Sequence, residues 1–133
     1  MPMRAIVMSL VVAMSLMVLA LPYEAAADCG DRTDMSSTPD GDAVAATGVS
    51  LMSSLNDGAQ QRFIVQVGAA LPDGTQLFVS ANGEPAGTMT VAGGIGTLDL
   101  NNDSALPAGT DPVCAIGHVW VTDANGTILL SGF

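Results

Sequence analysis

Apolar and polar residues alternate along most of the segment 62–100. Residues two apart lie on the same face of a β-strand, so this pattern predicts strands with one buried face, and no helical period competes with it. Pro-Asp-Gly, Asn-Gly and Gly-Gly sequences separate the alternating stretches, and they favour the positive φ angles of tight turns. The segment therefore predicts four short antiparallel strands, the first of which buries Phe63, Val65 and Val67.

Further strands are expected on both sides of this segment. Residues 43–55, interrupted by Gly48, predict one bent strand or two short ones. Residues 113–121 are apolar on both faces, which is typical of a central buried strand, and a last strand is expected over 127–133. The longer connection 101–112 would then cross between sheets. The predicted fold class is all-β, an antiparallel β-sandwich or partly open barrel of about seven or eight strands.

The N-terminal residues have the three parts of a secretory signal. A short first region carries Arg4, an apolar run spans 5–21, and Ala25-Ala26-Ala27 provides the small residues that a signal peptidase requires. A retained membrane anchor is the alternative, because the apolar run approaches the roughly 18–20 residues that span a bilayer. Cleavage is favoured because Pro22 breaks the apolar run before the small residues.

Three regions are expected along the chain. Residues 1–27 form an N-terminal signal helix, and residues 43–133 form a single β domain. Between them, residues 28–42 are rich in Asp, Ser, Thr, Pro and Gly without apolar periodicity, which predicts an irregular lead-in. We expect a secreted or periplasmic protein with no stable membrane insertion after the signal is cleaved.

The charge of the chain is strongly acidic. The formal net charge is −10, and removing residues 1–27 leaves it unchanged because that segment contains one Arg and one Glu. The rest of the chain has no lysine, and its basic side chains are Arg32 and Arg62. Such a surface repels phosphate backbones and anionic lipids, so nucleic acid is not an expected partner. The carboxylates are expected to keep the protein soluble, with calcium binding by some of them as the alternative.

Two cysteines, Cys29 and Cys114, make up the whole cysteine content. An even count in an exported chain predicts one disulfide, which would close a loop of more than eighty residues. Chain entropy gives such a cross-link a stabilising effect of roughly 4–5 kcal/mol before strain. A reactive thiol pair is disfavoured because Arg32 is the only basic residue close to either cysteine in the sequence.

Asp99, Asp103 and Asp111 are the weak candidates for a metal site. Oxygen ligands spaced from Asp99 to Asp103 match the start of an EF-hand loop, but Ser104 and Thr110 replace the glycine and glutamate that the motif requires. A looser calcium site with these three aspartates around the loop is one interpretation, and the competing interpretation is that Asp and Asn stabilise turns with their side chains. No other cofactor is predicted.

Catalytic and sugar-binding constellations are not evident in the sequence. The single histidine, His118, has no second histidine with which to build a zinc site, so we expect it to be packed or at a rim. A sugar-binding face would need several exposed aromatic residues in a plane. Phe78 is expected on an outward strand position without an evident companion, so packing is the favoured role of the aromatic residues. We expect a protein that is not an enzyme.

Three patterns of core and turn residues follow one another, namely F-x-V-x-V, L-x-V-x-x-N-G-x-x-x-G and G-x-L-x-L. Their residues are Phe63, Val65 and Val67, then Leu77, Val79, Asn82, Gly83 and Gly87, and finally Gly96, Leu98 and Leu100. Over residues 43–133 the arrangement resembles small exported bacterial all-β proteins with an immunoglobulin-like sandwich. The resemblance implies the fold and carries over no catalytic residue.

The predicted function is that of an exported, non-enzymatic structural or binding module at the cell envelope or in adhesion. Its partner would be an unidentified protein or glycan, and the chain is expected to be a monomer. The alternatives are a calcium-dependent binding domain and a small secreted protein inhibitor. Burial and turn geometry account for the residue types in the predicted strands. We therefore expect function in the loops, chiefly 101–112 and the segment around Cys29.

Overall fold

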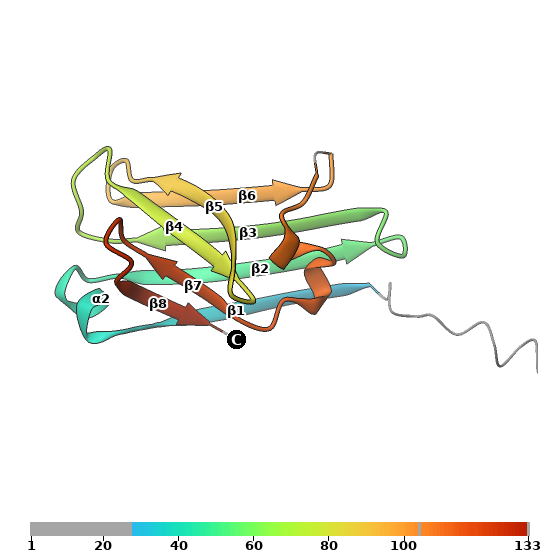
Figure 1. Ribbon diagram of the computed structural model, residues 1–133, viewed down its shortest axis with the longest axis horizontal. Helices are drawn as coiled ribbons and strands as arrows, with labels where there is room; N and C mark the ends of the chain where they lie inside the picture. The colour runs from blue at the N-terminus through green and yellow to red at the C-terminus, as the bar shows by residue number, and fades with distance from the viewer. Residues whose placement is uncertain (1–27, 104, 133) are drawn as a thin grey trace, which may run out of the picture.

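The computed structural model describes residues 28–103 and 105–132, which form eight antiparallel strands (Figure 1). The strands are β1 (Cys29–Ser37), β2 (Thr47–Leu55), β3 (Gln60–Gly68), β4 (Gln76–Ala81), β5 (Glu84–Thr90), β6 (Ile95–Asn101), β7 (Val119–Thr122) and β8 (Ile128–Gly132). A short helix, α2 (Pro39–Ala43), and two 3-10 turns, η2 (Ala108–Thr110) and η3 (Val113–Ala115), complete the regular elements of these residues. The predicted all-β class is confirmed. The predicted signal over 1–27 lies outside the described residues.

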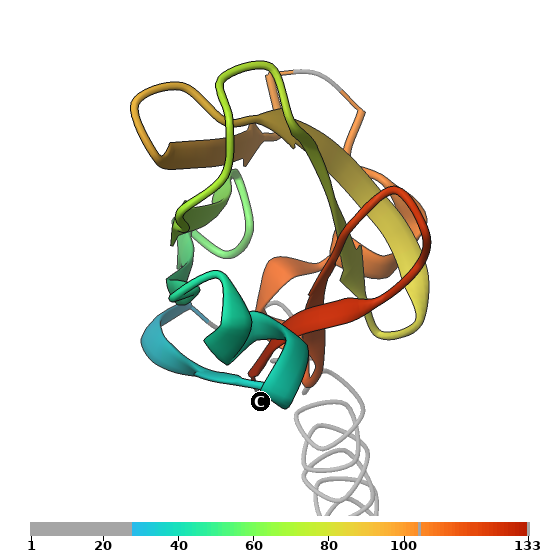
Figure 2. The same ribbon diagram turned by 90° about the vertical axis from the view of Figure 1, so that its left-hand side faces the viewer.

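The strands form one hydrogen-bonded order, β5-β4-β7-β8-β1-β2-β3-β6, folded into two layers (Figure 1). We call β1, β2, β3 and β6 the long sheet and β5, β4, β7 and β8 the short sheet. The end of β1 connects the layers, because Ser36 and Ser37 pair with Ser131 and Leu130 of β8. Figure 2 shows the resulting barrel end-on.

On its other side, between β5 and β6, the barrel has backbone pairing at the bridge between Ala92 and Ile95, and side chains close the rest. β5 and β6 are the two ends of the hydrogen-bonded order. A Cβ atom at Gly96 of β6 would lie 2.7 Å from the sulfur of Met89, and one at Gly87 of β5 would lie 2.7 Å from a methyl carbon of Leu98. These two glycines therefore provide the space into which the facing side chains pack, and the fold is a partly open barrel.

The core lies between the two sheets. Phe63, Val65 and Val67 of β3 are at most 1% exposed, as the alternating pattern predicts, and they belong to the same cluster as the inward residues of β4 and β7. The connection from β6 to β7 adds the buried Val113 and Ile116 to this cluster. Figure 1 places that connection at one end of the barrel and α2 at the other. Both ends of the core are thus covered.

The irregular lead-in predicted for 28–42 is wrong. Residues 29–37 form β1, which pairs with β2 over seven positions, and α2 follows with Thr38 as its N-cap. The sequence does not predict this strand because Met35 is the only buried residue of β1, and one buried residue gives no apolar alternation. Backbone hydrogen bonds between strands do not depend on side-chain polarity, and one face of an antiparallel sheet can stay in solvent. The β domain therefore begins at Cys29.

The strand predicted for 113–121 is only partly present, because β7 begins at Val119. Residues 113–115 form η3 instead, and Asn82 holds the segment that follows in an irregular path. Its side-chain amide donates to the Ala115 carbonyl, and its side-chain oxygen accepts from the Gly117 N–H. The apolar residues of this stretch, including Val113 and Ile116, are buried because they cover the end of the core. The sequence of this stretch is therefore as apolar as that of a buried strand.

Replacing Gly41 with alanine is expected to destabilise the fold by about 1–3 kcal/mol, the usual cost of overpacking. A Cβ atom at Gly41 would lie 2.0 Å from the main-chain oxygen of Leu129, because α2 packs directly on β8. Alanine has the higher helix propensity, so any loss of stability would be steric in origin. Urea unfolding measures it. The matched control is Gly30→Ala, where nothing lies within 4 Å of the new Cβ, and equal stability of the two variants would contradict the packing described.

Candidate functional site

The predicted disulfide is present and joins Cys29 to Cys114. It connects the first residue of β1 with η3 in the connection between β6 and β7. Both cysteines are partly buried against the core, and the described residues contain no free cysteine. A disulfide of this kind fits an oxidising compartment outside the cytoplasm.

The three aspartates proposed as metal ligands have different surroundings. Asp99 accepts hydrogen bonds from Nε and a terminal nitrogen of Arg62, at 3.0 and 2.6 Å. Asp103 donates its backbone N–H to the side chain of Asn101, and Asp111 lies exposed at the end of η2. Within residues 28–103 and 105–132, no group of three or more His, Cys, Asp and Glu residues is placed to hold a metal ion. Calcium binding therefore stays a prediction. Comparing the melting temperature of the protein with and without calcium tests it.

His118 lies one residue before β7, partly exposed beside Trp120. The centroids of the two rings are 4.8 Å apart, and the ring planes are nearly perpendicular at 79°. This edge-to-face arrangement is one of the favoured geometries for aromatic pairs. His118 thus takes a rim position on the short sheet.

The outer face of the long sheet gathers exposed apolar residues and both arginines of the described chain. Cross-strand pairing puts Arg32, Leu51, Ile64 and Asp99 in one row, and Asp34, Val49, Gln66 and Thr97 in the next. Of the four large hydrophobic residues that are exposed within the described residues, only Phe78 belongs to the short sheet. The other three are Leu51, Leu55 and Ile95, which are 38%, 50% and 51% exposed. We call this surface the arginine face.

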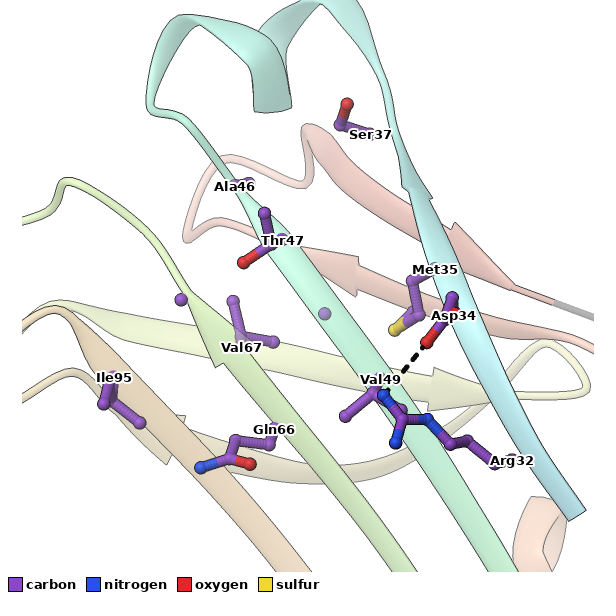
Figure 3. A pocket seen from close by; sticks show the side chains of 12 residues that line it. Arg32, Asp34, Met35, Ser37, Ala46, Thr47, Val49, Gln66, Val67 and Ile95 are labelled. Carbon is purple, nitrogen blue, oxygen red and sulfur yellow. Dashed lines mark hydrogen bonds and ion pairs between the residues drawn. The ribbon is translucent and has the colours of Figure 1, made fainter.

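A groove of about 540 Å³ runs over the arginine face (Figure 3). The outward row Thr47, Gly68 and Ile95 crosses it, and the hydroxyl of Thr47 lies 3.1 Å from the position that a Cβ of Gly68 would take. Gln66 and the Arg32–Asp34 pair contribute polar groups to the same groove. Its volume is within the range of pockets that hold small ligands or single side chains of a partner.

Each arginine on this face is paired with an aspartate. The Arg32 and Asp34 side chains approach to 3.4 Å while both remain largely exposed, so this pair contributes little to stability. The Arg62–Asp99 pair is bidentate, a geometry that makes charge-assisted hydrogen bonds stronger and more specific. These hydrogen bonds hold the pKa of Asp99 below its usual range and raise the pKa of Arg62. The charges on this face are therefore balanced, unlike those of the acidic chain as a whole.

Removing the guanidinium by Arg62→Gln is expected to raise the pKa of Asp99 toward that of a free aspartate. In the wild-type protein the lowered pKa of Asp99 contributes stability at neutral pH, and this contribution is lost as the pH falls through the lowered value. Carbon-detected NMR titration of the Asp99 carboxylate measures the shift directly. Arg32→Gln is the control and should leave Asp99 unchanged. An Asp99 titration that is the same in wild type and Arg62→Gln would show that the pair does not persist in solution.

The arginine face was not identified from the sequence, although part of its signal was present. Arg62, Ile64 and Gln66 occupy the positions between the buried residues of β3, so alternation alone assigns them to the outer face. Their neighbours Thr47 and Val49 come from β2, and Arg32 comes from the segment whose sequence predicts an irregular lead-in. Without the strand order, these residues have no apparent relation.

Comparison with protein-family models, with curated proteins and with solved structures found no significant match. In the part of the chain that the structure describes, no helix has the length and apolar character needed to cross a membrane.

Proposed function

We propose that this protein is an exported, non-enzymatic binding module and that it contacts a protein partner through the arginine face. The observation that carries the proposal is the gathering of Leu51, Leu55, Ile95 and both arginines on one sheet surface. On this surface Leu51 pairs with Ile64 and has Val49 beside it on β2, and Leu55 and Ile95 lie four register positions away on either side. Exposed apolar residues that adjoin one another and are rimmed by polar groups are typical of interaction sites on monomeric proteins. Arginine is also enriched in protein interfaces relative to the rest of the surface.

The chemistry of the arginine face favours a protein partner with aliphatic side chains. Leu51 and Ile95 would lose water on contact, and this burial is the main favourable contribution to association. The groove beside Gly68 has room for a partner side chain, and Gln66 and Thr47 at its edge can donate and accept hydrogen bonds. Because Arg62 and Asp99 already satisfy each other, they would orient the partner more than they would attract it.

Export is the cellular setting of the proposal. The disulfide between Cys29 and Cys114 favours an oxidising compartment, and the signal-like residues 1–27 favour secretion or a periplasmic location. A surface with ten excess negative charges would keep the protein soluble there. A role at the cell envelope or in adhesion fits these features.

Photo-cross-linking in the cells that naturally make the protein tests the proposal. A benzophenone amino acid replaces Leu51 at the centre of the arginine face, and the control replaces Asn125, which is exposed in the turn between β7 and β8. Light should join the Leu51 derivative to one defined envelope or secreted protein and leave the Asn125 derivative without that product. The proposal fails if no adduct forms at Leu51 or if both positions give the same set of products.

A further inference from the structure

The outer face of the short sheet is uncharged, although the chain carries a net charge of −10. β4, β7 and β8 contain no Asp, Glu, Lys or Arg, and in β5 the only charged residue is Glu84, which begins the strand at its hairpin end. Strand pairing and burial place ten residues outward on this surface, which we call the neutral face. They are Gln76, Phe78, Ser80, Pro85, Thr88, Thr90, Trp120, Thr122, Ile128 and Ser131.

Two aromatic side chains lie next to each other on the neutral face. Phe78 of β4 is 37% exposed and pairs with Thr122 of β7, while Trp120 of β7 pairs with Ser80. Phe78 and Trp120 are therefore diagonal cross-strand neighbours, a relation in which residues are about 7–8 Å apart and within reach of aromatic side chains. No companion of Phe78 is evident in the sequence because Trp120, about forty residues further along the chain, comes beside it only through the pairing of β4 with β7.

The polar groups around the two aromatic residues are hydroxyls and an amide, and Ile128 lies opposite Thr122. Thr88 and Thr122 flank Phe78 on the neighbouring strands, and Ser80 and Ser131 flank Trp120. A hydroxyl can both donate and accept a hydrogen bond, as can the amide of Gln76 through its two ends. The perpendicular ring of His118 supports the indole from the side. The neutral face thus combines an aromatic patch with hydrogen-bonding groups of both kinds.

We propose that the neutral face binds an uncharged polysaccharide. The faces of aromatic rings carry a negative partial charge, which attracts the C–H groups on the flat side of a sugar ring. Sugar hydroxyls donate and accept hydrogen bonds, so they match the Thr, Ser and Gln groups around Phe78 and Trp120. An ionic ligand finds no opposite charge within this surface, and a polyanion is repelled by the net charge of the chain. The proposal is independent of the arginine face, which lies on the other sheet.

Intrinsic fluorescence gives a direct test, because Trp120 is the only tryptophan in the chain. The oxidised protein is titrated with cellohexaose, laminarihexaose, mannohexaose and chitohexaose at up to millimolar concentrations. At least one of these should shift or quench the emission in a saturable manner. Phe78→Ala should weaken that binding about tenfold through loss of the stacked ring. Leu51→Ala, which removes a side chain of nearly equal exposure from the opposite sheet, should leave it unchanged.

Three results would overturn the proposal. The first is no saturable change with any of the four oligosaccharides. The second is equal affinity in wild type and Phe78→Ala, with circular dichroism showing both to be folded. The third is an equal response to polygalacturonate, which would show that the emission reports an adventitious effect unrelated to an uncharged ligand.

Discussion

Replacing Cys29 and Cys114 together by serine is expected to lower the free energy of unfolding by about 4–5 kcal/mol. The cysteines are 85 residues apart in the sequence, so the bond closes most of the described chain into one loop and restricts the unfolded state. Domains of this size are stable by only about 5–15 kcal/mol, so the variant should be marginally folded. Urea unfolding of the variant and of the oxidised wild type measures the difference.

Chemical reduction provides the control for this prediction. Wild-type protein unfolded in the presence of a thiol-free phosphine reductant should lose the same stability as the double serine variant, since both lack the covalent link between β1 and η3. A double variant as stable as the oxidised wild type would contradict the role assigned to the bond. A loss in the variant that reduction does not reproduce would assign the effect to the serine side chains.

Phe63→Ala is expected to cost about 3–5 kcal/mol, as for other aromatic residues truncated in a packed core. Phe63 is fully buried on β3, where its removal leaves a cavity between the two sheets. The matched substitution Phe78→Ala should cost about 1 kcal/mol or less, because that ring faces outward on β4. Thermal unfolding of both variants measures the contrast. Similar losses at the two positions would mean that the inward and outward faces of the strands have been assigned wrongly.

Alternation in the sequence is sufficient to predict the strands whose faces differ strongly in polarity. Phe63, Leu77 and Leu98 are buried on β3, β4 and β6 as the pattern predicts. β2 is different, because its inward positions include Ser50 and Ser54 while Leu51 is exposed. Pairing with β3 decides its orientation, since Ser50 lies opposite the buried Val65. Small inward residues on one strand are compensated by larger ones on its neighbours, and a single strand does not reveal this.

The candidate sites depend on pairing between strands that are not consecutive in the sequence. Arg62 meets Asp99 because β3 pairs with β6, and Phe78 is beside Trp120 because β4 pairs with β7. Such pairings between strands that are not consecutive have no local signature, whereas hairpins are marked by their turns. The sequence therefore predicts function in the loops, whereas the strand order places the candidate residues on the two outer sheet faces.

The arginine face and the neutral face belong to different sheets of one barrel, so the two proposals can fail separately. Substitutions at Leu51 probe the first and substitutions at Phe78 probe the second, and the two side chains are almost equally exposed. The same core and the same disulfide support both surfaces.

Hydroxyl-radical footprinting tests most directly whether contacts are made by the sheet faces instead of the loops. The purified, disulfide-bonded protein is exposed to hydroxyl radicals with and without an envelope fraction from the cells that make it. Mass spectrometry then measures the modification of each side chain. We expect protection of Leu51, Leu55 and Ile95, with the connection 101–112 equally reactive in both samples. Protection confined to 101–112, or no protection of the three apolar side chains, would contradict the account.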